Sequence, residues 1–75
     1  MEAPHILVID DEKEITDLIE IYLSQEGYHV EKRYNALTLL EDIRTYQIDL
    51  VILDVMMPEI NGIQALKMIR EKYNI

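Results

Sequence analysis

The chain has 75 residues, 49% of them hydrophobic, and no cysteine, so it forms one small domain at most, without disulfides or a cysteine-bound metal. Its net charge of -8 repels nucleic-acid phosphates and anionic lipids, so we expect these residues to bind neither nucleic acid nor a membrane surface. The longest purely apolar run, residues 50–53, is too short to cross a bilayer, and the amino terminus lacks a signal-peptide pattern, so the expected compartment is the cytoplasm.

The first half of the chain predicts a strand, a helix and a second strand. Residues 5–9 are a short run, rich in β-branched side chains, that ends in two aspartates, as a strand buried on both faces would. Residues 13–26 predict an amphipathic helix, with the acids and Thr16 facing away from the core and Gly27 in a left-handed conformation after its end. The apolar positions of this helix are Ile15, Leu18, Ile19, Tyr22 and Leu23. Residues 28–33 alternate weakly and predict a strand at a sheet edge.

The second half predicts a helix, a strand and a further helix. Asn35 can cap a helix that ends near Thr45, and residues 49–54 form a third strand, apolar inside and acidic at its end. Apolar residues at helical spacing mark the two helices: Ala36, Leu39, Leu40 and Ile43 in the first, and Ile63, Leu66, Ile69 and Tyr73 in the second. This alternation of strands and helices with short connections predicts a parallel α/β sheet with right-handed crossovers.

Three aspartates follow the two most apolar strands. Ligands of parallel sheets bind beyond the carboxyl ends of the strands, and if these two strands are neighbours, Asp10, Asp11 and Asp54 meet there. Two carboxylates about 4 Å apart repel each other by roughly 4 kcal/mol at an effective dielectric of about 20, so the group favours a hard cation such as magnesium. Asp54, which stands alone, is the expected nucleophile toward a phosphoryl group, whereas Asp11 would bind the metal directly and Asp10 through water.

Two segments resemble a known family. Residues 9–12, IDDE, and residues 49–62, DLVILDVMMPEING, are similar to the signature of two-component response-regulator receiver domains. The resemblance implies a flavodoxin-like fold, with three parallel strands in the order 2-1-3 and three helices, and a sensor histidine kinase that phosphorylates Asp54. The magnesium ligands that it implies are Asp10, Asp11, Asp54 and the backbone carbonyl of Met56. The first helix, with the text EKEITDL, is most similar to receivers of OmpR-type winged-helix regulators, which implies control of transcription by the full-length parent.

Residues 1–75 resemble only the first part of a receiver domain. A complete receiver continues with two more strand–helix units, which carry a Ser or Thr and a Lys that contact the phosphoryl oxygens, and neither residue can be assigned here. We therefore expect a partial receiver domain that is a signalling module and not an enzyme. The alternative is a truncated or engineered half-receiver without signalling competence, which self-associates as a homodimer through the exposed edge of its third strand.

Two other functions fit the sequence less well. A phosphatase of the haloacid dehalogenase type needs a second aspartate two residues after its nucleophile, where this chain has Met56. A flavin- or nucleotide-binding half-sheet should have a phosphate loop rich in Gly or Ser/Thr after the first strand, where this chain has three acids. His5 and His29 are far apart in the sequence and have no partner motif, so they are predicted to be solvated or edge histidines rather than ligands.

Overall fold

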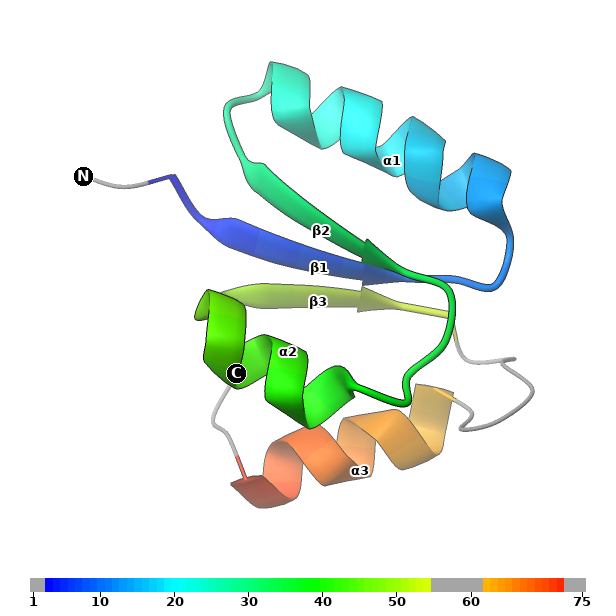
Figure 1. Ribbon diagram of the computed structural model, residues 1–75, viewed down its shortest axis with the longest axis vertical. Helices are drawn as coiled ribbons and strands as arrows, with labels where there is room; N and C mark the ends of the chain where they lie inside the picture. Colours follow the sequence, from blue (N-terminus) through cyan, green and yellow to red (C-terminus); the bar gives the residue numbers. More distant parts are fainter. Residues whose placement is uncertain (1–2, 55–61, 73–75) are drawn as a thin grey trace.

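The computed structural model describes residues 3–54 and 62–72, which form a three-stranded parallel sheet with helices on both faces (Figure 1). In chain order the elements are β1 (His5–Ile9), α1 (Lys13–Gln25), β2 (His29–Arg33), α2 (Leu39–Tyr46), β3 (Leu50–Leu53) and α3 (Gly62–Lys72). The strand order is β2-β1-β3, so the edge position predicted for the second strand is confirmed. The predicted α/β architecture, three parallel strands of a flavodoxin-like fold in the order 2-1-3 with three helices, is confirmed as well.

The central strand β1 aligns the other two. Ile6 is opposite Val30 of β2 on one side and Leu50 of β3 on the other, and all four residues from Ile6 to Ile9 are buried. A strand covered on both faces needs such a continuous apolar run. The backbone N–H of Asp54 also donates to the carbonyl oxygen of Ile9 at 3.0 Å, one residue beyond β3. The carboxyl ends of β1 and β3 are therefore held side by side.

The main core lies between the sheet and the two helices α2 and α3, which share one face, while α1 covers β1 and β2 on the other (Figure 1). Its buried members are Leu7, Ile9, Ala36, Leu39, Ile43, Ile48 and Ile69. On α3, however, Ile63 and Leu66 are exposed, and only Ile69 of the predicted apolar positions is buried; Tyr73 lies outside the described residues. Among the described strands none lies beyond β3, and a groove between β3 and α3 is lined by Leu66 and Ile69 of the helix.

Helix α1 faces the sheet with a different side than the sequence predicts. Thr16 is fully buried, and its Oγ1 donates to the carbonyl oxygen of Lys13 at 2.9 Å, so the prediction that it faces away from the core was wrong. Ile15, Leu18 and Tyr22 are exposed instead. Ile19 and Leu23 of the predicted apolar face are half-buried, and Lys32 of β2 forms ion pairs with two acids of the same helix.

The start of α2 also differs from the prediction. The Asn35 side-chain oxygen accepts a hydrogen bond from the backbone N–H of Leu37 at 2.9 Å, and α2 itself begins at Leu39. Asn35 therefore closes a turn before the helix, a local bond that its short side chain forms readily, and does not cap the helix. The left-handed Gly27, with φ of 90°, follows α1 as predicted.

No helix in the described ranges is long and apolar enough to span a membrane.

Candidate functional site

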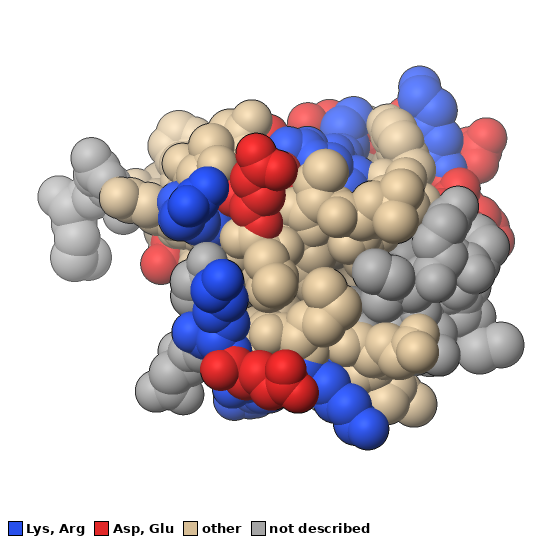
Figure 2. All heavy atoms as spheres, turned by 60° about the horizontal axis from the view of Figure 1, so that its bottom comes forward, with Lys and Arg blue, Asp and Glu red and all other residues tan. Residues whose placement is uncertain are grey.

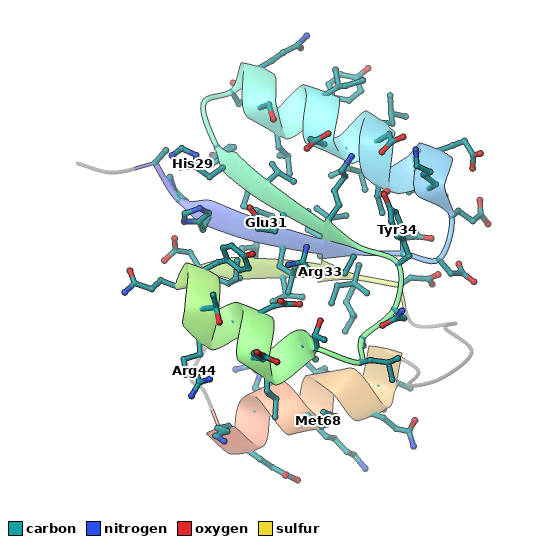
Figure 3. The ribbon with its side chains drawn as sticks, in the orientation of Figure 1. His29, Glu31, Arg33, Tyr34, Arg44 and Met68 are labelled. Carbon is teal, nitrogen blue, oxygen red and sulfur yellow. The ribbon has the colours of Figure 1, made fainter. Side chains whose placement is uncertain are left out.

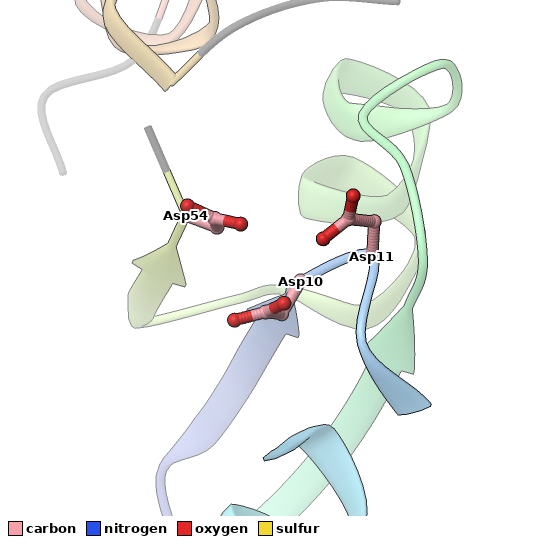
Figure 4. A group of neighbouring side chains, drawn as sticks. All are labelled: Asp10, Asp11 and Asp54. Carbon is pink, nitrogen blue, oxygen red and sulfur yellow. The ribbon is translucent and has the colours of Figure 1, made fainter. Parts of the chain in front are cut away.

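Three carboxylates meet at the carboxyl edge of the sheet, as the sequence predicts. Asp10 and Asp11 follow β1 and Asp54 follows β3, and one oxygen from each lies within 4.8 Å of the others. Figure 4 shows the three side chains turned toward a common space. Because neighbouring parallel strands end at the same edge, residues more than forty positions apart in the chain become neighbours.

The surrounding backbone holds Asp10 more firmly than Asp11. One carboxylate oxygen of Asp10 accepts a hydrogen bond at 2.9 Å from the backbone N–H of Glu12, which fixes the turn leading into α1. The backbone N–H of Asp10 donates to the carbonyl oxygen of Arg33 at 3.2 Å, so β2 anchors it from the other side. Asp10 and Asp54 are half-buried, whereas Asp11 is exposed. Asp11 therefore has the greatest freedom to turn toward an incoming ion.

The donor set fits a small, hard divalent cation. Magnesium takes oxygen ligands at about 2.0–2.1 Å in octahedral geometry, so ligand atoms on opposite sides of the ion are roughly 4 Å apart. Ligand atoms at neighbouring positions are closer, roughly 3 Å apart, and the three carboxylate oxygens, all within 4.8 Å of one another, lie near this range. The residues present thus fit a magnesium ion. Met56, whose carbonyl is the predicted fourth ligand, lies outside the described residues.

A partly buried ion pair that the sequence did not predict joins α2 to the end of β2. The Arg33 guanidinium contacts both carboxylate oxygens of Asp42, at 3.0 and 3.2 Å, and the Thr38 hydroxyl donates to one of them at 2.7 Å. Arg33 is also the residue whose carbonyl oxygen anchors Asp10. No local pattern in the sequence indicates this pair, because its partners belong to different elements.

A second ion-pair cluster fixes α1 beside the site. The Lys32 ammonium lies 2.8 Å from Asp17 and 3.0 Å from Glu20, both on α1. Hydrogen bonds to these two carboxylates raise the pKa of Lys32 well above its usual value. Because α1 begins directly after the acidic residues, this cluster helps to set the direction in which the chain leaves Asp11.

The sequence matches the family profile described as "Response regulator receiver domain" over residues 6–75. Among curated proteins, it is 48% identical over 68 residues to the regulatory protein VanR of Enterococcus faecium, covering 91% of this chain. It is 44% identical over 71 residues to a CpxR homolog, a transcriptional regulatory protein of Haemophilus influenzae, covering 93% of this chain. The chain spans only 29% of the length of VanR and 30% of that of the CpxR homolog.

A solved structure with a similar fold is that of the response regulator TrrA of Thermotoga maritima in complex with Mg2+ and BeF. It is 39% identical to this chain with a TM-score of 0.85, and the match covers 92% of this chain and 60% of TrrA. A second structure, equally similar, contains TrrA in complex with the histidine kinase ThkA.

Proposed function

The chain belongs to the response regulator receiver domain family, and we propose that it is the phosphoacceptor module of a two-component response regulator. In this function Asp54 accepts a phosphoryl group from a sensor histidine kinase, and the chain acts in signalling rather than as an enzyme. The observation that carries the proposal is the convergence of Asp10, Asp11 and Asp54 within 4.8 Å at the carboxyl edge of the sheet. The similar protein TrrA is bound to a histidine kinase in a solved structure, which supports a histidine kinase as the partner of this chain.

The reaction needs one nucleophile and a separate set of metal ligands. An Asp54 carboxylate oxygen attacks the phosphorus of a phosphohistidine that is protonated on its other ring nitrogen. A P–O bond forms, the P–N bond breaks, and the neutral imidazole leaves with the P–N electron pair. Magnesium, when bound, supplies positive charge that offsets the charge of the phosphoryl oxygens. Asp11, Asp54 and the Met56 carbonyl oxygen would hold the ion directly. Asp10 acts through water, which agrees with its existing bond to the Glu12 N–H.

We also propose that residues 1–75 are the first part of a receiver domain in a longer, cytoplasmic OmpR-type transcription regulator. The match to 60% of TrrA and to about 30% of the CpxR homolog supports this. The remaining strand–helix units would supply the Ser or Thr and the Lys that contact the phosphoryl oxygens. With its net charge of -8, this segment itself would not bind nucleic acid.

Titration with Mg2+ tests the metal site. Asp11→Asn and Asp54→Asn should each weaken Mg2+ binding, because each removes a charged oxygen ligand, whereas Glu41→Gln, which neutralises an exposed acid on α2, should not. Circular dichroism of each variant verifies that it is folded. Unchanged affinity in a folded Asp11→Asn or Asp54→Asn variant would contradict the assignment.

Acetyl phosphate tests the acceptor. Asp54 of this chain should gain a phosphoryl group, seen by intact mass, at least about a hundredfold more slowly than the same residue in a complete receiver, because preorganised donors to the developing charge are missing. Asp54→Asn should abolish the modification in both proteins. Equal rates in the two proteins would show that the Ser or Thr and the Lys are dispensable for acceptance.

A second proposed function is self-association through the open edge of the sheet. Among the described strands, β3 pairs only with β1, and a groove of about 280 Å3 lies between β3 and α3. The groove is lined by Leu50, Val51, Leu53, Leu66, Ile69 and Arg70. Uncharged surface occupies the middle of the face shown in Figure 2, with charged side chains around its margin. A second copy placed about a two-fold axis would cover this edge in both chains.

A further inference from the structure

Two histidines that are 24 positions apart in the sequence lie in contact at the amino edge of the sheet. His5 begins β1 and His29 begins β2, and they are opposite each other in the parallel register. Their ring centroids are 4.8 Å apart with an angle of 33° between the ring planes. The backbone N–H of His29 donates to the carbonyl oxygen of Pro4 at 3.0 Å, which ties the start of β2 to the residue before His5. The sheet therefore fixes the two side chains as neighbours.

The spacing of the rings suits a shared metal ion. Imidazole nitrogen is a preferred ligand of zinc, copper(II) and nickel(II). Each imidazole nitrogen lies about 2.0–2.1 Å from a tetrahedral zinc ion, which places the centroids of two coordinating rings on the order of 5 Å apart. The observed 4.8 Å meets this requirement. His29 is exposed and His5 half-buried, so water has access to the remaining coordination positions.

Asp49 adds negative charge on the other side of His5. Its carboxylate accepts a hydrogen bond from the backbone N–H of His5 at 2.9 Å, and its own N–H donates to the His5 carbonyl oxygen at 2.8 Å. Within residues 3–54 and 62–72, no lysine or arginine forms an ion pair with Asp49. The three residues thus follow one another across the starts of β2, β1 and β3, with the Asp49 carboxylate bound to the backbone of His5.

We propose that His5 and His29 form a binding site for a transition-metal dication of the zinc class at the amino edge of the sheet, with Asp49 assisting through its charge. The site is separate from the acidic one. Figure 3 shows His29 at the start of β2, while Tyr34 follows the opposite end of that strand. The two sites also differ in chemistry, because imidazole nitrogen selects zinc-class ions and carboxylate oxygen selects magnesium. This proposal does not depend on the phosphoacceptor function.

Titration of ZnCl2 into the chain, with Mg2+ in large excess to occupy the acidic site, tests the proposal by calorimetry and proton NMR. We expect one zinc per chain, with the ring signals of both histidines shifting together up to one equivalent. The chain has only two histidines, so these signals are unambiguous. His29→Gln removes one of the two imidazole ligands. It should weaken zinc binding at least about tenfold, the loss that follows even from changing a residue that only supports a ligand, and Asp49→Asn should weaken it less.

Asp54→Asn is the matched control, since it alters the acidic site and should leave zinc binding in excess Mg2+ unchanged. Unaltered zinc affinity in His29→Gln would overturn the proposal, and so would half an equivalent of zinc per chain, which would mean that the ion bridges two chains. If His29→Gln fails to fold by circular dichroism, the unmodified chain decides the question. Histidine ring signals that stay in place, or shift independently of each other, during the zinc titration would then overturn the proposal.

Discussion

The Arg33–Asp42 pair joins the end of β2 to α2. The Asp42 side chain is only 9% exposed. Burial by itself lowers the pKa of Arg33, but the hydrogen bond and charge of Asp42 outweigh burial and raise it above its usual value. Arg33→Met would leave the Asp42 carboxylate buried without its guanidinium. We expect this change to lower the free energy of unfolding by about 3 kcal/mol, at the lower end of the range for buried pairs because Arg33 is partly exposed.

Urea denaturation measures this effect, and the double variant Arg33→Met/Asp42→Leu is its control. Replacing both partners by apolar side chains removes the unpaired charge, so the double variant should regain most of the lost stability. A double variant as unstable as Arg33→Met would contradict the interpretation that the unpaired carboxylate causes the loss.

Asp17 links stability to pH. The hydrogen bond from Lys32, together with the charges of Lys13 and Lys32, lowers the pKa of Asp17 below 3.8, although burial opposes the change. Ionised Asp17 therefore stabilises the fold above that pH, and the stabilisation is lost as the pH falls through the lowered pKa. Asp17→Asn should lower Tm at neutral pH, and the difference from the unmodified chain should shrink below pH 3.8.

Thermal unfolding at neutral and acidic pH, followed by circular dichroism, tests this linkage. Glu14→Gln is the control, because Glu14 is an exposed acid of the same helix without an ion pair within the described part of the chain. A difference in Tm between Asp17→Asn and the unmodified chain that stays constant from neutral to acidic pH would show that the Lys32 contact does not act through charge.

At the scale of whole elements, α1 and α2 each contain a leucine at a predicted core position, but only the one on α2 is buried. Leu18 of α1 is 55% exposed, whereas Leu39 of α2 is buried in the main core. Leu18→Glu should change the free energy of unfolding by less than about 0.5 kcal/mol, as surface substitutions usually do. Leu39→Ala should cost about 2–5 kcal/mol through lost burial and a cavity. Chemical denaturation measures the free energy of unfolding of both variants. A loss well above about 0.5 kcal/mol in Leu18→Glu would mean that α1 buries its predicted apolar face after all.

Local sequence patterns predict the helices and strands of the fold. They do not predict which face of α1 is buried or at which residue α2 begins. Residues 5–9 form β1 with the predicted bounds, because a run of β-branched residues between polar ones has few alternatives. The burial of Thr16 depends on how α1 packs against β1 and β2, which the pattern of the helix alone does not determine. The Asn35 side chain can accept a hydrogen bond from an N–H of a turn before α2 or from an N–H of the first turn of the helix. The same sequence allows both bonds, so the start of α2 was not predictable.

The acidic site was predictable because strand order alone brings Asp10, Asp11 and Asp54 together, whatever the exact register. The histidine contact was not predictable, because it needs the register of β1 against β2 to be correct to one residue. A weakly alternating edge strand does not determine that register from its own sequence. His5 and His29 were therefore predicted to be solvated or edge residues, and the proposal of a shared metal ion rests on their contact in the sheet.

The whole molecule combines an open sheet edge with a net charge of -8, and the two have opposite effects on association. Burying apolar residues of β3 against a second copy is favourable by roughly 1.5–3 kcal/mol for each side chain fully covered. Repulsion between two equally charged chains opposes dimer formation and is screened by salt. The proposed dimer should therefore become tighter as the salt concentration rises, whereas a contact made by surface ion pairs would become weaker.

Leu50→Lys tests where the chains meet. Leu50 is 52% exposed and lines the groove beside β3, so the substitution should leave the monomer folded but place two like charges in a two-fold contact. Sedimentation equilibrium should show dimerisation weakened at least about tenfold, the equivalent of one buried leucine. Leu37→Lys, which changes a 63% exposed leucine before α2 and alters the net charge equally, should dimerise like the unmodified chain. A compact monomer at every concentration from micromolar to millimolar, or equal weakening by both substitutions, would rule out association through the β3 edge.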